Sequence, residues 1–292
     1  MVITVLTPTY NRAYSLNRLF QSLVNQSVKD FEWIIVDDGS TDNTESLVRK
    51  YFLTNDFPIR YYKKNNGGKH TALNTGVEFA NGDYVFIVDS DDFLTVDSIE
   101  KIIFYVNQID LNAAFCGVSG NKVYENGSKV GGEVDYKVID IDSVSFREKL
   151  KIRGDMAEVW RRSVLLEYKF PVFENERFLS EGAVWSEIAR KYKLRYINEP
   201  VYVCEYLEDG LTKNVFKCFH GSPKGTMLVY SRYMKDSRFR LITRIKSAIH
   251  YWQYTCDFDG IRPRDLKPVW WAYIFWPLGW FLNRKGVGSL SR

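Results

Sequence analysis

The chain has 292 residues, a formal net charge of +4 and 45% hydrophobic residues, enough to bury one large core with an appendage. Its four cysteines, at positions 116, 204, 218 and 256, form no CxxC pair, which argues against a zinc site or a disulfide framework and favours reduced thiols in the cytosol. The first residues show neither a charged n-region nor an apolar h-region, so no secretory signal peptide is expected.

Apolar runs alternate with helical periodicity over residues 1–107. A strand is predicted at 2–6. The helix that follows is indicated by apolar residues that share one face: Leu16, Leu19, Phe20, Leu23 and Val24. Further strands are expected at 31–36, 59–62 and 83–88, and further helices at about 42–52, 69–80 and 97–107. This alternation predicts an α/β fold with a mainly parallel sheet covered by helices.

An acidic turn, Asp37-Asp38-Gly39, follows the strand predicted at 31–36. By itself it is typical of a turn before a helix, with Asp42 and Glu45 at the helix start. Open α/β sheets, however, bind ligands outside the carboxyl ends of their strands, where this turn would lie.

A second acidic cluster, at 89–92, follows the apolar run at 84–88. In an extended segment residues i and i+2 point to the same side, so the carboxylates of Asp89 and Asp91 can converge where the strand ends. Two such oxygen ligands suit Mg²⁺ or Mn²⁺, which in turn suit a diphosphate. The alternative is that these aspartates cap the next helix.

Two common nucleotide-binding motifs are missing. A P-loop would need Gly where Lys63 stands and Ser or Thr where His70 stands. No GxGxxG follows the first strand, where residues 7–11 read TPTYN. The sequence therefore disfavours P-loop ATPases and dinucleotide-dependent dehydrogenases.

Four motifs, in order and at matching spacing, resemble those of family 2 glycosyltransferases with the GT-A fold. They are TPTYNR at 7–12, VDDGSTD at 36–42, NGGKHTALNTG at 66–76 and DSDD at 89–92. A weaker similarity continues to about residue 212. In that part GDMAE at 154–158 and Glu181, followed by Trp185, look like the acceptor-side motifs of one bacterial branch.

The resemblance implies a role for each motif. The nucleotide donor would be bound by Pro8, Tyr10, Arg12, Asp37, Asp38, Lys69, Asp89 and Ser90. Asp38 would accept a hydrogen bond from a pyrimidine N–H, and Lys69, unless it is simply a solvated lysine, would approach the diphosphate or the base. Asp89 would bind the ribose or an outer-sphere water. Asp91 would bind Mn²⁺ or Mg²⁺ directly, and the ion would act as a Lewis acid on the leaving diphosphate.

An inverting transfer also needs a base, because a sugar hydroxyl is a poor nucleophile at neutral pH. The resemblance indicates Glu181, ahead of a predicted helix. Gly182 stands where the family often has a second acid, which leaves Asp155 and Glu158 as alternative bases. Trp185 is a further acceptor-side candidate, and Glu181 could instead serve only as a helix N-terminal carboxylate.

The charge of the chain changes near residue 212. Residues 213–292 hold 15 of the 40 Lys and Arg but 4 of the 36 Asp and Glu. We therefore predict a GT-A domain over 1–212, with a nucleotide-binding half at 1–105 and an acceptor half at 106–212. A basic extension at 213–292 would follow, with helices at about 215–235 and 238–256.

An aromatic segment at 268–285 closes the extension. Its uncharged core, 269–282, holds four of the eight tryptophans and is shorter than the ~20 residues that span a bilayer. Aromatic residues flanked by Lys and Arg predict peripheral contact with an anionic membrane. An oligomer interface and a strap packed on the core are the alternatives. No nucleic-acid recognition motif is found, so nucleic acid is not an expected partner.

The resemblance and the tail together predict a metal-dependent inverting glycosyltransferase, of hexosyltransferase type, at the cytoplasmic face of the plasma membrane. It would move a sugar from a nucleotide-sugar donor, a UDP-sugar, to a saccharide or lipid-linked saccharide acceptor in surface-polysaccharide biosynthesis. One alternative is a nucleotidyltransferase acting on a sugar phosphate, although residues 7–12 lack its Gly-rich basic loop. The other is a catalytically silent nucleotide-sugar-binding scaffold on the membrane.

Overall fold

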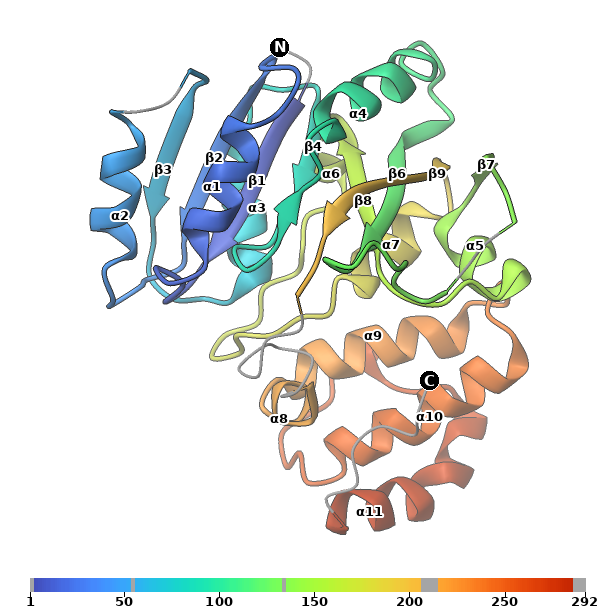
Figure 1. Cartoon of the computed structure of the whole chain (residues 1–292). Helices are drawn as coiled ribbons and strands as arrows, with labels where there is room; N and C mark the ends of the chain where they lie inside the picture. Colours follow the sequence, from blue (N-terminus) through green and yellow to red (C-terminus); the bar gives the residue numbers. More distant parts are fainter. Residues whose placement is uncertain (1–2, 54–55, 133–134, 206–214, 286–292) are drawn as a thin grey trace. The chain divides into compact units, whose positions relative to one another are not determined.

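The computed structural model describes residues 3–53, 56–132, 135–205 and 215–285 (Figure 1). These residues form two compact units. The sheet unit is drawn from Met1–Lys169 and Ile188–Leu207, and the helical unit from Phe170–Glu187 and Glu208–Arg292. Each unit is described by itself.

One mixed sheet organises the sheet unit, in the strand order β3-β2-β1-β4-β8-β6-β9-β5, with β7 paired to β9 (Figure 1). The strands are β1 (Ile3–Thr9), β2 (Phe31–Asp37), β3 (Ile59–Lys63), β4 (Tyr84–Ile87), β5 (Phe93–Leu94), β6 (Phe115–Val123), β7 (Val138–Ile141), β8 (Met156–Arg161) and β9 (Lys193–Val203). The first four strands are parallel to one another, whereas β8 is antiparallel to both β4 and β6. The first residues of β8 therefore reach the edge at which β1, β2 and β4 end.

The predicted alternation of strands and helices over the first 107 residues is confirmed. The helices are α1 (Leu16–Val24), α2 (Thr44–Tyr51), α3 (Lys69–Phe79) and α4 (Ser98–Asn107). On α1 the predicted apolar face is buried except at Val24, which is half-buried. The α/β fold class follows from these elements and is also confirmed.

Aromatic packing fixes the two helices that lie against β2. Trp33 is fully buried. The centroid of its ring lies 6.2 Å from the ring centroid of Phe20 on α1 and 5.9 Å from that of Tyr51 on α2. Its indole N–H donates a hydrogen bond to the Thr7 hydroxyl of β1 at 2.9 Å. Buried tryptophans usually need such a partner, so this contact ties the core to the strand that leads into the first motif.

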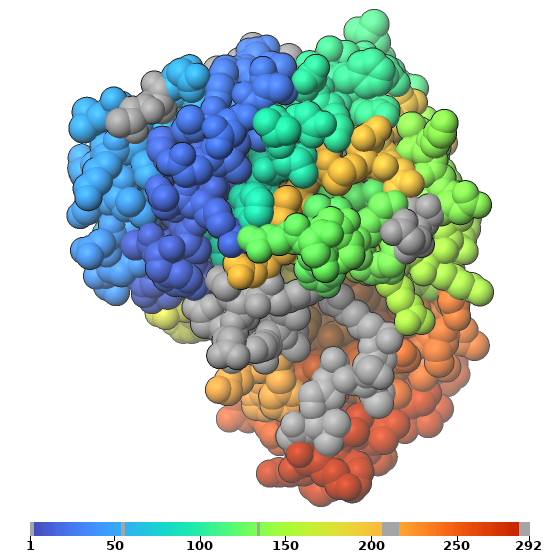
Figure 2. All heavy atoms as spheres, in the orientation of Figure 1, coloured from blue at the N-terminus to red at the C-terminus, as the bar shows by residue number. Residues whose placement is uncertain are grey.

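The second half of the sheet unit adds α5 (Ser143–Leu150) and α6 (Arg162–Glu167) to strands β6 to β9. The parallel pairing of β6 with β9 shifts register at several points, so that Lys122 comes to lie opposite Tyr202. Figure 2 shows the gold segment of the chain, which includes β9, between a teal and a green segment that come earlier in the sequence. Residues distant in sequence thus meet near the end of β4.

The helical unit contains α8 (Val215–His220), α9 (Pro223–Lys235) and α10 (Leu241–Thr255), together with most of α7 (Gly182–Ile188). The segment predicted to be helical at about 215–235 is confirmed, but it forms two helices, because the chain breaks at Gly221 and restarts with Pro223 in the first turn of α9. Proline is favoured at that position because its missing N–H has no partner there in any helix. The helix predicted at 238–256 is confirmed as α10.

The division into units differs from the predicted boundary. Residue 212 lies outside the described residues, but residues 170–187, expected in the acceptor half, belong to the helical unit. Within that unit the Glu176 carboxylate accepts hydrogen bonds from the backbone N–H groups of Lys224 and Gly225, both at 2.8 Å. Buried charges need such partners, so Glu176 holds this stretch against the start of α9.

The aromatic segment forms η2 (Trp270–Phe275) and α11 (Trp276–Arg284), and the short helix η1 (Arg264–Leu266) precedes it. One side of it packs on α10: the Trp252 indole donates to the Ala272 carbonyl at 2.8 Å, and Gly279 is buried against Trp252. A Cβ at Gly279 would lie 2.4 Å from the Trp252 Cβ, so only glycine permits this approach. Among the described residues, no helix has both the length and the apolarity required to cross a membrane.

Candidate active site

The loop after β1 is joined to the loop after β2 by hydrogen bonds. Asn11, at φ +52, donates its backbone N–H to the Ser40 hydroxyl at 2.8 Å, and its side-chain oxygen accepts from the Thr41 N–H at 2.8 Å. Asparagine tolerates this left-handed conformation better than most residues. Of the predicted donor residues here, Pro8 is buried inside β1, Tyr10 is exposed, and Arg12 is half-buried.

The carboxylate of Asp37 holds the acidic turn in shape. Its Oδ1 accepts the Ser40 N–H at 2.6 Å, and its Oδ2 accepts the Tyr61 hydroxyl of β3. Gly39 follows at φ +87, and a Cβ there would lie 3.0 Å from the backbone nitrogen of Asn66. The turn therefore requires glycine, as its Asp-Gly sequence indicated.

Asp38 is buried and organises residues 64–68. Its Oδ1 accepts hydrogen bonds from Lys64 Nζ at 2.7 Å and from the Gly67 N–H at 3.0 Å, and its Oδ2 accepts the Gly68 N–H at 2.7 Å. A pyrimidine N–H, the predicted ligand of Asp38, would have to share these oxygens with the three bonds that they already accept. Asp38 thus fixes the chain that leads into α3, a role that the motif alone did not indicate.

Lys69 begins α3 and links two of the motifs. Its Nζ lies 2.6 Å from Asp89 Oδ1, beyond the end of β4. Burial by itself would raise the pKa of Asp89, but the charges of Lys69 and Lys122 lower that pKa below its usual value. The structure therefore brings Lys69 and Asp89 together as an ion pair at the edge of the sheet, where the start of a helix also favours anions.

The cluster at 89–92 is held against β9. The Tyr202 hydroxyl accepts the Asp89 N–H at 3.0 Å and donates to Asp92 Oδ2 at 2.7 Å. Ser90 is buried, and its carbonyl accepts a hydrogen bond from the Ser15 hydroxyl at 3.0 Å. These contacts turn the cluster into a fixed loop rather than a helix cap.

Negative charge is concentrated in this loop. Burial, followed by the charge of Asp89, raises the pKa of Asp91 and raises the pKa of Asp92 to about 7. The Arg12 guanidinium lies 3.9 Å from Asp91 and only partly offsets the charge. An added cation would be electrostatically favoured here.

These carboxylates fit a divalent ion that arrives with a diphosphate. Within the described part of the chain, no group of three or more His, Cys, Asp or Glu side chains could hold a metal by itself. Mg²⁺ in phosphate sites takes one or two carboxylates and completes its shell with phosphate oxygens and water. Asp91, with Asp89 two residues earlier, supplies such a partial set.

The acceptor-side carboxylates of the sheet unit lie on and just before β8. Asp155 is exposed directly before the strand, and Glu158 is half-buried opposite Ser119 of β6. Both charges raise the pKa of Lys122, as does that of Asp89. Asp155 and Glu158 are therefore brought near the loop that carries Asp89.

Glu181 and Trp185 lie in the helical unit and are described within it. Glu181 directly precedes α7, and its carbonyl accepts the N–H groups of Val184 at 2.9 Å and Trp185 at 3.0 Å. The prediction that Glu181 lies at the start of a helix is confirmed. Trp185 is half-buried and packs edge-on against Phe170, with ring centroids 5.4 Å apart.

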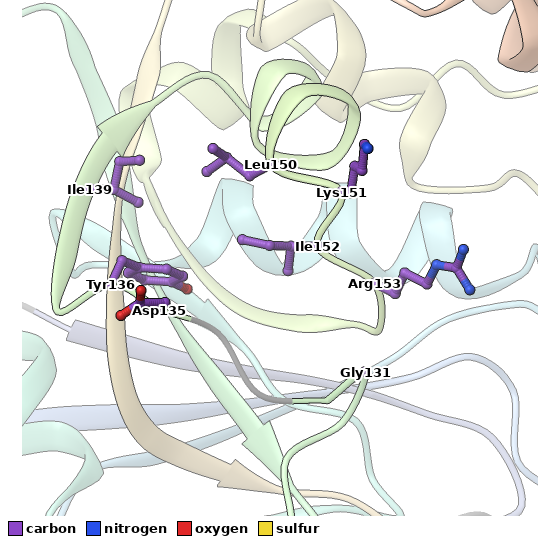
Figure 3. A pocket seen from close by; sticks show the side chains of 8 residues that line it. All are labelled: Gly131, Asp135, Tyr136, Ile139, Leu150, Lys151, Ile152 and Arg153. Carbon is purple, nitrogen blue, oxygen red and sulfur yellow. The ribbon is translucent and has the colours of Figure 1, made fainter.

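A separate hollow of about 320 Å³ lies in the sheet unit (Figure 3). Its lining residues are Gly131, Asp135, Tyr136, Ile139, Leu150, Lys151, Ile152 and Arg153. Lys151 and Arg153 stand at the end away from Tyr136, whose hydroxyl has no hydrogen-bond partner among the described residues. None of the predicted site residues lines it.

Three residues of the site belong to none of the sequence motifs. Lys64 and Tyr202 form hydrogen bonds with the predicted aspartates, and the charge of Lys122 acts on Asp89, because the fold brings these residues together. The available signal was a charged residue inside an otherwise buried strand, which Lys122 provides in β6. Such a lysine needs a partner or a function.

The chain is similar to known proteins in both sequence and structure. Residues 4–151 match the family model described as glycosyl transferase family 2. An uncharacterised glycosyltransferase of Haemophilus influenzae is 35% identical over 127 residues, which cover 42% of this chain. The match spans 51% of that relative, so the chain covers about half its length.

A longer match comes from Campylobacter jejuni. Its GalNAc(5)-diNAcBac-PP-undecaprenol beta-1,3-glucosyltransferase is 28% identical over 230 residues, covering 75% of this chain and 71% of the relative. Among solved structures, Staphylococcus aureus TarS in complex with UDP-GlcNAc superposes with a TM-score of 0.62 at 17% identity, covering 96% of this chain and 79% of that one. This likeness confirms the predicted GT-A fold.

Proposed function

The chain belongs to glycosyltransferase family 2, and on that premise we propose that it moves a sugar from a UDP-linked donor to a hydroxyl of a saccharide or lipid-linked saccharide acceptor. The observation that carries the proposal is the meeting of four motifs at one edge of the sheet. Asp38 holds the chain that leads into α3, and the first residue of α3, Lys69, pairs with Asp89 beside Asp91.

The donor would lie along this edge. Lys69, freed from Asp89 or shared with it, would approach the diphosphate at the start of α3, where backbone N–H groups and the helix dipole favour anions. Arg12, already 3.9 Å from Asp91, would add positive charge on the other side. The nucleotide would occupy the loops after β1 and β2, which the bonds of Asn11 and Asp37 hold in place.

A divalent ion, Mn²⁺ or Mg²⁺, would be held by Asp91, with Asp89 supporting it through water or contacting the ribose. When bound, it would supply Lewis-acid stabilisation of the leaving nucleoside diphosphate. The crowding of Asp91 and Asp92 beside Asp89 supports this assignment, because a cation would offset their mutual repulsion.

The transfer would be a displacement with inversion, as the family implies. Glu181 would accept the proton of the acceptor hydroxyl while the oxygen bonds to the anomeric carbon and the bond to the diphosphate breaks. Asp155 and Glu158 remain the alternative bases. The Campylobacter relative, by its name, acts on an undecaprenyl-linked glycan, which supports a lipid-linked acceptor and a place in surface-polysaccharide assembly.

Nucleotide binding gives the first test. With UDP, GDP, dTDP and CMP as probes, UDP with Mn²⁺ should give the largest rise in thermal stability. A ligand at a hundred times its dissociation constant adds about 2.7 kcal/mol to the free energy of unfolding. A larger shift with GDP would overturn the choice of donor base, and no shift with any nucleotide would overturn the function.

We further propose that the enzyme lies at the cytoplasmic face of the plasma membrane, attached through the outer side of η2 and α11. Trp270 is 83% exposed and Ile274 73%, and Trp276, Trp280 and Phe281 are each more than 40% exposed. Lys and Arg flank this surface at Arg264, Lys267, Arg284 and Lys285. Exposed aromatic residues with adjacent cations favour an anionic lipid surface.

Replacing both Trp270 and Ile274 by serine should weaken binding to anionic vesicles by about tenfold or more, because each large apolar side chain contributes on the order of 1.5–3 kcal/mol when buried. Point changes are preferred to truncation, since η2 and α11 also pack on α10. The matched control replaces Leu53 and Leu111, which are 85% and 101% exposed in the sheet unit. Equal loss in both double variants, or no vesicle binding by the full chain, contradicts the attachment.

A further inference from the structure

Lys122 lies beside Tyr202 of the site without belonging to any motif. It lies near the end of β6, opposite Tyr202 of β9. The antiparallel register of Asn121 with Met156 also places it close to Asp155, directly before β8. Its Nζ lies 4.3 Å from the centroid of the Tyr202 ring. The same tyrosine binds both Asp89 and Asp92 through its hydroxyl.

The charges of four carboxylates act on this ammonium. Burial by itself would lower the pKa of Lys122, but the charges of Asp89, Asp155, Asp92 and Glu158 raise it above its usual value. The side chain therefore stays positively charged, and the acids that act on it form two groups. One group ends β4 and would bind the diphosphate and its metal, and the other begins β8 on the acceptor side.

The hydrogen-bonding capacity of this cation is unused by the described residues, which give its N–H groups no acceptor. The other lysines of the site differ. Lys69 pairs with Asp89 at 2.6 Å, and Lys64 donates to Asp38, Thr71 and the Asn65 carbonyl. A half-buried ammonium needs acceptors, and a sugar hydroxyl between the two acidic groups would supply one.

We infer that Lys122 binds the transferred sugar of the donor, holding a hydroxyl between the diphosphate-binding loop and the acceptor-side carboxylates. This inference rests on the proposed function, because it takes the loop at 89–92 as the diphosphate end of the site. Lys122 would then contribute to the choice of sugar, since a site built to bond a hydroxyl discriminates against sugars that lack it or place it differently.

The test compares UDP with UDP-sugars. Binding of UDP, UDP-glucose, UDP-galactose and UDP-GlcNAc to the full chain is measured by calorimetry with Mn²⁺, for the wild type and for Lys122→Met. UDP affinity should stay within about twofold, while the best UDP-sugar should bind roughly tenfold or more weakly, as expected for loss of a charged hydrogen bond. Lys137→Met, on an exposed lysine of the same unit, is the control.

The outcomes distinguish a failure of the inference about Lys122 from a failure of the proposed function on which it rests. If the wild type binds neither UDP nor any UDP-sugar, the proposed function fails. If it binds them and Lys122→Met weakens UDP and UDP-sugar equally, or neither, the inference alone is overturned. Should Lys122→Met fail to fold, Lys122→Gln loses the charge but keeps a neutral donor, so UDP should bind as in the wild type and the best UDP-sugar should bind more weakly by a smaller factor than expected for Met; equal effects on both ligands would overturn the inference.

Discussion

Asp91→Asn is expected to abolish sugar transfer, with kcat lower by on the order of 10³-fold, and to remove the Mn²⁺-dependent part of UDP binding. The amide keeps the shape of the side chain but loses the negative charge that a hard divalent ion requires. The fold should persist, because the change removes one of three crowded charges rather than a buried partner.

Two measurements check this expectation: turnover with saturating donor, and UDP titration with and without Mn²⁺. Asp56→Asn is the matched control, since Asp56 is 63% exposed and lies 3.7 Å from Lys29 in a partly exposed ion pair. Metal-dependent turnover that survives in Asp91→Asn would remove Asp91 from the metal site and leave Asp89 or Asp92 as the ligand.

Glu181→Gln should lower kcat by about 10²–10⁴-fold while UDP-sugar binding stays near that of the wild type. Glutamine preserves the side-chain shape but cannot accept the acceptor's proton, so only the chemical step should suffer. The backbone carbonyl that starts α7 is unaffected by the change, which protects the local structure.

Glu174→Gln serves as the control, because Glu174 is exposed and lies in the same unit. Asp155→Asn and Glu158→Gln test the alternatives on β8. Normal turnover in Glu181→Gln together with an inactive Asp155→Asn would transfer the role of base to Asp155, on the sheet unit.

The donor half of the site could be predicted because its signals are local. The strands β2 and β4 are short apolar runs, and each ends at the aspartates that the resemblance assigns to the donor or the metal. A parallel sheet then brings these ends to one edge regardless of side-chain detail. Even so, the three bonds accepted by Asp38 depend on residues 64–68, which approach it only in the folded chain.

Two of the features that escaped prediction depend on contacts distant in sequence, and a third was a local signal. Lys122 reaches the site because β6 pairs with both β8 and β9, with register shifts that no periodicity reveals. Residues 170–187 join the helical unit through the bonds of Glu176 to the start of α9. The break in the helix predicted at 215–235 was a local signal, Gly221 and Pro223, that the longer apolar pattern obscured.

The central claim is that the edge formed by Asp38, Lys69, Asp89 and Asp91 supports transfer of a sugar from UDP. The most direct measurement is the product released when the full chain is incubated with each UDP-sugar and Mn²⁺. Slow release of UDP and free sugar, absent in Asp91→Asn, is the expected result, since water replaces the missing acceptor. Release of pyrophosphate from a nucleoside triphosphate and sugar phosphate, with no UDP from any UDP-sugar, would contradict the claim and favour a nucleotidyltransferase.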